Sequence, residues 1–226
     1  MLSRFFASRN LYCDDGVVYI PQFLDNPQEY LSWKYVEACL ARDDLYWELI
    51  DANGDKKPLR DFKPFWSPVP CQDKMTIYNH IKNGESFVII GYSKLNRKVQ
   101  DMCIEIERSL DVNVDIHVYG GKGESPSFKT HCDHFSNFII QTLGQTPWRV
   151  FKNKQTSLLE CKNDKPINYD IMEVEWEGIL KPGDLLYIPD RAYHQAMPQE
   201  ERLSMSIPCC PTVLNTEFYD RRNYKI

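Results

Sequence analysis

Two hydrophobic patterns divide the chain near residue 110. Before that point, apolar residues recur at helical spacing in residues 25–43, 73–82 and 94–110, and a strand is predicted at 86–90. Beyond it, short β-type runs alternate with turn signals such as GG, KPGD and PD. Many short strands joined by tight turns are typical of a sandwich or barrel.

The pattern therefore predicts a mainly β protein with a helical N-terminal part. We expect residues 1–110 to form a helical lobe and residues 111–226 to form a β-barrel on which it packs, in one compact unit. A chain of 226 residues suits such a unit. Residues 57–71 carry four prolines and several large aromatic residues, and we expect an extended segment packed on the core.

Candidate chemistry begins with His131 and Asp133, which flank Cys132. In a strand, residues two apart point to the same face, so both side chains would enter a barrel mouth while Cys132 points away. A His-x-Asp pair alone is a weak signal, and a histidine paired with a carboxylate on a solvated loop is the alternative. His134, one position further, would leave that face.

A second signal lies between Gly183 and His194. The spacing of Gly183, Pro189 and His194 reproduces the second cupin motif, with Arg191 where glycine is usual. A turn at KPGD would start a strand, and the turn at Pro189 would return the chain so that His194 faces the mouth. Together, His131, Asp133 and His194 predict an open Fe(II) site of two imidazoles and one carboxylate, with three coordination positions left for other ligands.

Charge and composition exclude several classes of protein. The net charge of −5 and the scattered Lys and Arg residues argue against a nucleic-acid module, and no apolar run is long enough for a membrane span. The first residues lack a secretory signal, so we expect a cytoplasmic protein, with a short mitochondrial presequence as the weaker alternative. Eight cysteines without a CxxC pair are typical of reduced thiols.

These motifs carry a family resemblance. The segment from about residue 68 to residue 208 resembles the cupin-like JmjC family of Fe(II)- and 2-oxoglutarate-dependent oxygenases, in particular its ribosomal oxygenase and asparaginyl hydroxylase branches. The matching stretches are GESFVIIGY, VDIHVYGGKGESPSFKTHCDHFSNFIIQTLGQTPWRVF and LKPGDLLYIPDRAYHQA.

The resemblance implies a double-stranded β-helix barrel of cupin or jelly-roll type, flanked by helices. It implies Fe(II) held by His131, Asp133 and His194, with 2-oxoglutarate and O2 as co-substrates. The expected enzyme is a dioxygenase that hydroxylates a C–H of an amino-acid side chain, in a peptide or protein or in an amino-acid-like small molecule, and releases succinate and CO2.

One position departs from the family pattern. The distal carboxylate of 2-oxoglutarate needs a cation, which these families usually place where this chain has Thr146. Arg202 and Ser204 resemble the Arg-x-Ser pair that serves other 2-oxoglutarate oxygenases, and residues two apart in a strand share a face. Lys129 and Arg149 remain alternatives, as does an exposed Arg202 with no such role.

Further polar residues are candidates for contacts with the co-substrate. Tyr119 lies on the strand before the metal dyad, Asn137 matches an asparagine of the asparaginyl hydroxylases, and Thr146 retains a hydroxyl. Trp148 fits a core position. For Tyr119, ordinary strand packing is the competing interpretation.

Two other functions stay open. One is a metal-dependent cupin enzyme that does not use 2-oxoglutarate, although the usual three histidines and a glutamate are missing. The other is a non-catalytic cupin-fold binding protein. The choice between hydroxylation and demethylation, the substrate, and the oligomeric state are not determined by the sequence.

Overall fold

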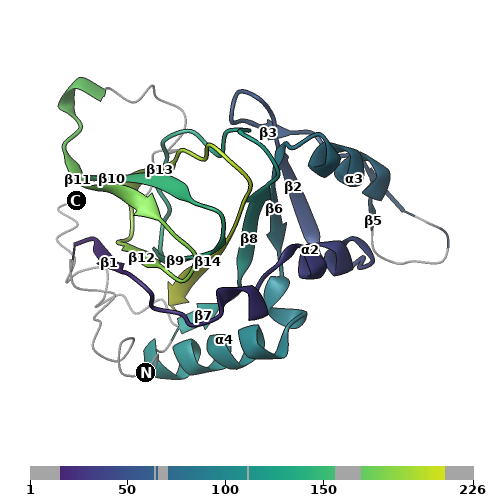
Figure 1. Cartoon of the computed structure of the whole chain (residues 1–226), viewed down its shortest axis with the longest axis horizontal. Helices are drawn as coiled ribbons and strands as arrows, with labels where there is room; N and C mark the ends of the chain where they lie inside the picture. Colours follow the sequence, from purple (N-terminus) through teal and green to yellow (C-terminus); the bar gives the residue numbers. More distant parts are fainter. Residues whose placement is uncertain (1–15, 64, 66–70, 111, 156–168, 212–226) are drawn as a thin grey trace.

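Antiparallel strands from both halves of the chain join in one large sheet (Figure 1). The structure is a computed structural model and describes residues 16–63, 65, 71–110, 112–155 and 169–211. Within that part, the large sheet has the strand order β1-β12-β9-β14-β8-β6-β2-β3, with β7 paired to β14. A smaller sheet has the order β11-β10-β13.

The strands of the large sheet are β1 (Val18–Ile20), β2 (Tyr46–Ile50), β3 (Lys56–Lys57), β6 (Ser86–Ile90), β7 (Val112–Val114), β8 (His117–Gly121), β9 (Ser136–Leu143), β12 (Leu185–Ile188) and β14 (Arg202–Pro211). The smaller sheet holds β10 (Thr146–Lys154), β11 (Val174–Leu180) and β13 (Ala192–Ala196). The helices are α2 (Trp33–Leu40), α3 (Lys74–Lys82) and α4 (Arg97–Leu110), with 3-10 turns η1 (Pro27–Glu29), η2 (Tyr92–Lys94) and η3 (Tyr169–Ile171).

The two sheets face each other and enclose an apolar interior. Residues of β9 and β12 on the large sheet pack against residues of β10 and β13 on the small one, among them Ile139, Leu186, Val150 and Ala192. A larger core lies between the large sheet and the helices. The predicted β-barrel with flanking helices is thus confirmed, and the barrel is formed by two antiparallel sheets.

The helix α4 buries the stripe that its spacing predicted. Val99, Met102, Cys103, Ile106 and Leu110 are all buried. At the start of α3, the Asp73 carboxylate accepts hydrogen bonds from two backbone N–H groups of the first turn, which caps the helix.

The helix predicted over residues 25–43 is broken into η1 and α2. Leu31 turns into the core between them, and Ser32 adopts an extended conformation before α2 begins. The Asn96 side chain donates to the carbonyl oxygens of Glu29 and Tyr30 at 2.9 Å each, which satisfies backbone groups that a continuous helix would have paired internally. A contact between residues distant in the sequence therefore breaks the helix that the local periodicity predicted.

Residues before 110 also contribute strands to the large sheet. β1 pairs with β12 of the barrel, and β2 pairs with β6. The sequence predicted only β6 among them, because β1 and β3 are too short to show an alternating pattern.

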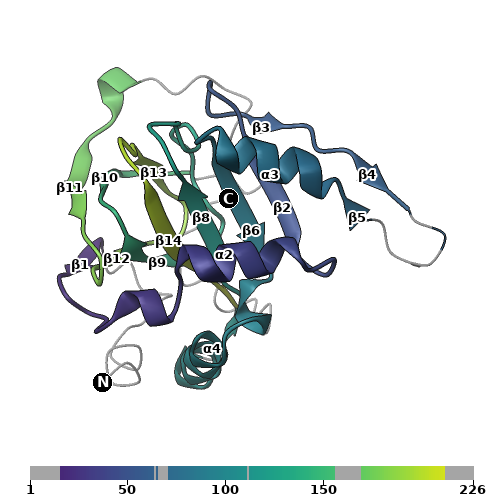
Figure 2. The same cartoon turned by 45° about the vertical axis from the view of Figure 1, so that its right-hand side comes forward.

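The proline-rich segment does not pack as predicted. β4 (Asp61–Phe62) and β5 (Cys71–Gln72) pair only with each other, and their ribbon extends away from the body of the molecule (Figures 1 and 2). The Phe62 side chain is 47% exposed and Phe65 is 97% exposed. A two-stranded ribbon has no second layer to cover it, so the expected core packing was wrong for these aromatics; Trp66 lies outside the described residues.

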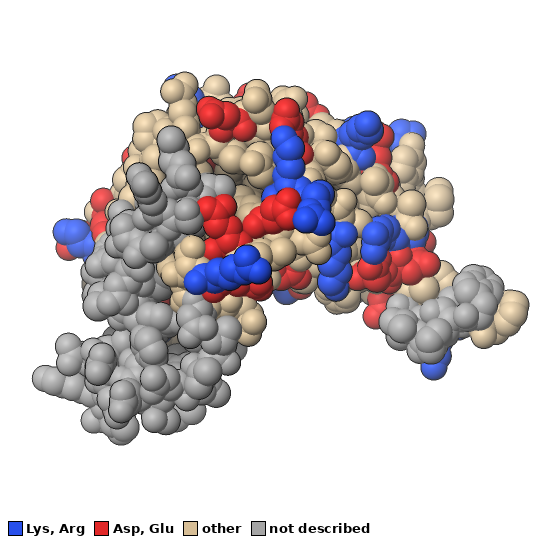
Figure 3. Space-filling view, turned by 90° about the horizontal axis from the view of Figure 1, so that it is seen from below, with Lys and Arg blue, Asp and Glu red and all other residues tan. Residues whose placement is uncertain are grey.

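Charges of both signs are interspersed on the surface. On the face seen from below in Figure 3, Lys and Arg side chains lie beside Asp and Glu side chains. Among the described residues, no helix is long and apolar enough to cross a membrane.

Gly183, in the KPGD turn, should be sensitive to substitution. Its φ is +95°, and an added Cβ would lie 2.8 Å from the carbonyl oxygen of Leu24. We expect Gly183→Ala to lower the free energy of unfolding by about 2–4 kcal/mol, since backbone strain and a backbone clash combine. Chemical denaturation measures this effect.

Gly84 provides the matched control. Its φ is also positive, at +85°, but the nearest atom to an added Cβ is 3.5 Å away. Gly84→Ala should therefore cost only about 1 kcal/mol. Equal losses in the two variants would show that the contact with Leu24 is unimportant.

Candidate active site

The turn before β13 delivers His194 and also holds the metal dyad. Arg191 in this turn has φ +59°, the left-handed conformation for which glycine is usual at this place in the motif. Its backbone N–H donates to the carbonyl oxygen of Asp133 at 2.7 Å. The left-handed turn therefore ties the second motif to the first.

His131 and His194 are joined by a backbone bridge. The N–H of His131 donates to the carbonyl of His194 at 3.1 Å, and the reverse bond measures 2.8 Å. Beyond this isolated bridge, residues 132 and 133 are not in a strand, so the strand predicted around the dyad was wrong. Contacts with β13 and the turn before it, and not a regular ladder, position His131 and Asp133.

Cys132 nevertheless points away from the site, as expected. Its side chain is fully buried, and its Sγ donates to Gln155 Oε1 at 3.0 Å. His134 is exposed.

The two imidazoles are oriented by backbone carbonyls. His131 Nδ1 lies 2.7 Å from the carbonyl oxygen of Lys129, and His194 Nδ1 lies 2.9 Å from that of Ala192. A carbonyl oxygen only accepts, so each Nδ1 carries the proton and each Nε2 retains its lone pair. This is the tautomer that a metal ligand requires.

The three candidate ligands converge. Ligand atoms of His131, Asp133 and His194 all lie within 4.8 Å of one another, and His194 Nε2 is 3.7 Å from Asp133 Oδ2. Two nitrogens and one carboxylate oxygen form a donor set that suits Fe(II) and leaves other positions open. The residues present therefore fit the metal that the sequence predicted.

These residues line one pocket at the barrel mouth. Its lining includes the three predicted metal ligands and the residues first chosen for the co-substrate: Tyr119, His131, Asp133, Asn137, Thr146, His194, Arg202 and Ser204. The two reserve cations lie elsewhere, since Lys129 pairs with Asp55 and Arg149 pairs with Glu177 on the surface.

Arg202 brings a buried positive charge to this pocket. The residue is 5% exposed, and desolvation lowers the pKa of its guanidinium to about 10. Among the described residues, no carboxylate forms an ion pair with it. Its Nη groups donate to the carbonyls of Gly123 and Ser125 at 3.0 Å each and to Ser86 Oγ.

Two buried polar atoms on β10 lack a partner in the part of the chain that the structure describes. Thr146 Oγ1 and Trp148 Nε1 form no hydrogen bond there, although both residues are buried and line the pocket. Residues two apart on a strand share a face, so both side chains come from the same side of β10. Sequence reasoning placed Trp148 only in the core; its spacing from Thr146 was the signal that could have placed it here.

Tyr119 and Asn137 also contribute polar groups to the pocket lining. Burial, together with the nearby charges of Asp133 and Glu48, raises the pKa of the Tyr119 hydroxyl, which therefore stays protonated. Asn137 Oδ1 accepts from Ser206 Oγ at 2.8 Å. Phe128, which the sequence did not indicate, packs edge-on against both Tyr119 and His131.

A barrel of two antiparallel sheets with two histidines and one aspartate at its mouth defines a cupin-type fold with a candidate mononuclear metal site. The family model described as "JmjC domain" matches residues 90–215, more than half of the chain. The chain therefore belongs to the JmjC domain family.

Curated relatives share this region of the chain. A protein of Drosophila persimilis named "Bifunctional lysine-specific demethylase and histidyl-hydroxylase NO66" is 27% identical over 182 residues, which cover 78% of this chain and 25% of the relative. A protein of the same name from Dictyostelium discoideum is 25% identical over 142 residues, covering 62% and 28%. The chain thus spans about a quarter of the length of these relatives.

Solved structures show the same fold. Escherichia coli YcfD superposes with a TM-score of 0.65 at 18% identity, covering 96% of this chain and 54% of that one. Its complex "with Cobalt and 2-oxoglutarate", described as a ribosomal oxygenase, has a TM-score of 0.61 at 18% identity, covering 98% and 55%. At this identity the likeness establishes the fold alone.

Asp133 provides the direct test of the metal centre. We expect Asp133→Ala to weaken Mn(II) or Co(II) binding by more than about 100-fold, because it removes the single anionic ligand. Isothermal titration calorimetry measures this loss. The exposed neighbour His134→Ala should bind as the wild type does, and equal affinities of both variants would rule out a ligand role for Asp133.

Proposed function

We propose that this chain is an Fe(II)- and 2-oxoglutarate-dependent oxygenase that hydroxylates a C–H bond of an amino-acid side chain. Membership of the JmjC family supports this proposal, as do the hydroxylase and demethylase named among its relatives and the 2-oxoglutarate complex of YcfD. The substrate is a peptide or protein, or an amino-acid-like small molecule. The relatives' names favour the peptide or protein.

In this proposal His131, Asp133 and His194 hold the metal. When bound together, Fe(II), 2-oxoglutarate and O2 supply the oxidising power for C–H hydroxylation, with succinate and CO2 as co-products. The protein contributes orientation, since carbonyl oxygens fix both imidazoles.

The observation that carries the proposal is the buried charge of Arg202 in the same pocket. A buried guanidinium without a carboxylate partner is costly unless a bound anion compensates it. The guanidinium has five N–H groups. Three of them donate within the protein, namely both on Nη2 and one on Nη1. The Nε–H and one Nη1–H remain; they lie on opposite edges of the guanidinium, so one of them donates to the distal carboxylate of 2-oxoglutarate in this proposal.

The remaining polar residues surround this carboxylate in our proposal. Ser204 lies two residues along β14 from Arg202 and lines the same pocket. Thr146 Oγ1 and Trp148 Nε1 offer hydrogen-bonding groups that have no partner among the described residues. Tyr119 and Asn137 supply further hydrogen bonds to the co-substrate or the substrate.

Replacing Arg202 should affect the co-substrate selectively. We expect Arg202→Ala to raise the KM for 2-oxoglutarate by roughly 100-fold, the loss of about 2–3 kcal/mol that charge-assisted hydrogen bonds contribute, while metal affinity is unchanged. Steady-state kinetics and metal titration separate the two effects. If Arg202→Ala leaves this KM unchanged while Lys129→Ala or Arg149→Ala raises it, the distal carboxylate is bound by one of those two residues and not by Arg202.

The activity itself is tested by turnover of 2-oxoglutarate. The protein is loaded anaerobically with Fe(II) and 2-oxoglutarate and then exposed to air, with and without candidate peptides. Succinate should form with wild-type protein and fall to background with Asp133→Ala. The proposal fails if no candidate yields succinate and 2-oxoglutarate does not stabilise the metal-bound protein against heat. That result would favour a metal-dependent cupin enzyme that does not use this co-substrate.

A further inference from the structure

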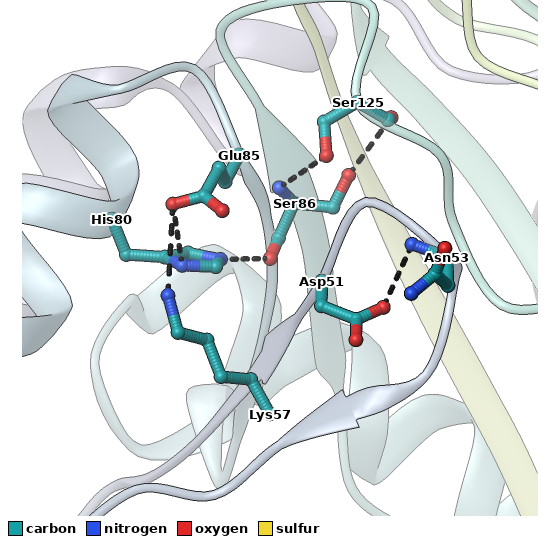
Figure 4. Close-up of polar contacts among 7 residues, drawn as sticks. All are labelled: Asp51, Asn53, Lys57, His80, Glu85, Ser86 and Ser125. Atoms are coloured by element: carbon teal, nitrogen blue, oxygen red, sulfur yellow. Dashed lines mark hydrogen bonds and ion pairs between the residues drawn. The ribbon is translucent and has the colours of Figure 1, made fainter.

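Ser86, at the start of β6, contacts the guanidinium of Arg202 and lines the same pocket. The residue is 1% exposed, and its Oγ accepts from Arg202 Nη2 and donates to the carbonyl of Ser125 at 3.0 Å. Its backbone N–H donates to Ser125 Oγ at 3.2 Å. Ser86 and Ser125 are therefore bonded to each other twice (Figure 4), and both bond to Arg202.

A second set of contacts reaches Ser86 from the helix α3. His80 is 2% exposed, and its Nε2 donates to the carbonyl oxygen of Ser86 at 2.7 Å. Its Nδ1 lies 2.9 Å from Glu85 Oε2, and Lys57 Nζ lies 4.0 Å from the same oxygen (Figure 4). His80 thus links α3 to the first residue of β6.

The guanidinium of Arg202 lies so close to the backbone of β8 that only glycine fits opposite it. Gly121 pairs with Arg202 across β8 and β14, and an added Cβ there would lie 2.3 Å from Arg202 Nη1. The guanidinium is therefore confined between the backbone of β8, the carbonyls of residues 123 and 125, and Ser86. Its direction is set by these contacts before any ligand arrives.

We propose that Ser86 is a positioning residue that aims Arg202 at the co-substrate, with His80 and Glu85 holding the end of β6 in place. The inference rests on the proposed function, because it assumes that Arg202 binds the distal carboxylate. Without the Ser86 hydroxyl, the guanidinium loses one of the acceptors that direct it, and its remaining N–H groups lose their alignment with the ligand.

A pair of keto acids tests this role. 2-Oxoglutarate and 2-oxopentanoate have the same chain length, but only the former carries the distal carboxylate. We expect Ser86→Ala to weaken 2-oxoglutarate binding to the Mn(II)-loaded protein by about tenfold, and 2-oxopentanoate binding by less than about twofold, as measured by calorimetry or competition. A general structural defect would weaken both ligands equally.

Further variants complete the test. Ser136→Ala removes another buried hydroxyl, one that accepts from Tyr187 at 3.2 Å and lies outside the pocket lining, and should leave both affinities unchanged. In an Arg202→Ala background, adding Ser86→Ala should have no further effect, because the two residues act as one unit. Glu85→Gln, at the partly exposed end of the chain of contacts, should weaken 2-oxoglutarate binding by about twofold to threefold.

The outcomes separate this inference from the proposed function. If wild type binds 2-oxoglutarate, Arg202→Ala loses it and Ser86→Ala keeps full affinity with a native circular dichroism spectrum, the positioning role is overturned and the function stands. An equal loss for both keto acids also overturns it. If the wild type itself does not bind 2-oxoglutarate, the proposed function fails first.

Discussion

The reciprocal backbone bridge between His131 and His194 is the contact on which the candidate site depends. It joins two motifs that are far apart in the sequence and sets the separation of the imidazoles, whose ring centroids lie 4.5 Å apart. The Arg191 N–H then fixes Asp133 against the same turn. Because these bonds are made by the backbone, the fold itself aligns the triad, which reduces the ordering that metal binding requires.

The second constraint is the charge of Arg202. Desolvating a guanidinium is expensive, and neutral carbonyls and a hydroxyl compensate only part of the cost. A surface position on β10, such as that of Arg149, would have avoided this cost, but there the charge is neutralised by Glu177. Because Arg202 is buried and no described carboxylate pairs with it, its charge favours the binding of an anion, as the proposed function requires. The Thr146 hydroxyl on β10, which has no partner among the described residues, is consistent with a cation supplied from β14 instead.

Sequence reasoning predicted the barrel, the helices α3 and α4 and the convergence of His194 with the dyad, because periodicity and motif spacing are local signals. It also placed Arg202 and Ser204 on one strand face toward the pocket. It missed the break before α2, which depends on Asn96 reaching across to Glu29 and Tyr30. The short strands and the Ser86 contacts were missed for the same reason. Contacts between residues so distant in sequence leave no local pattern from which they can be inferred.

One loop connects the two halves of the site. Residues 122–130 follow β8, and Arg202 holds the carbonyls of Gly123 and Ser125 near the start of the loop. Near its end, the carbonyl of Lys129 orients the imidazole of His131. Arg202, to which the proposed function assigns the co-substrate, therefore also anchors the start of this loop. His131, at its end, is held in addition by the backbone bridge to His194. The metal ligand is thus fixed by contacts that do not include Arg202, which is why replacing Arg202 should affect the co-substrate and spare the metal.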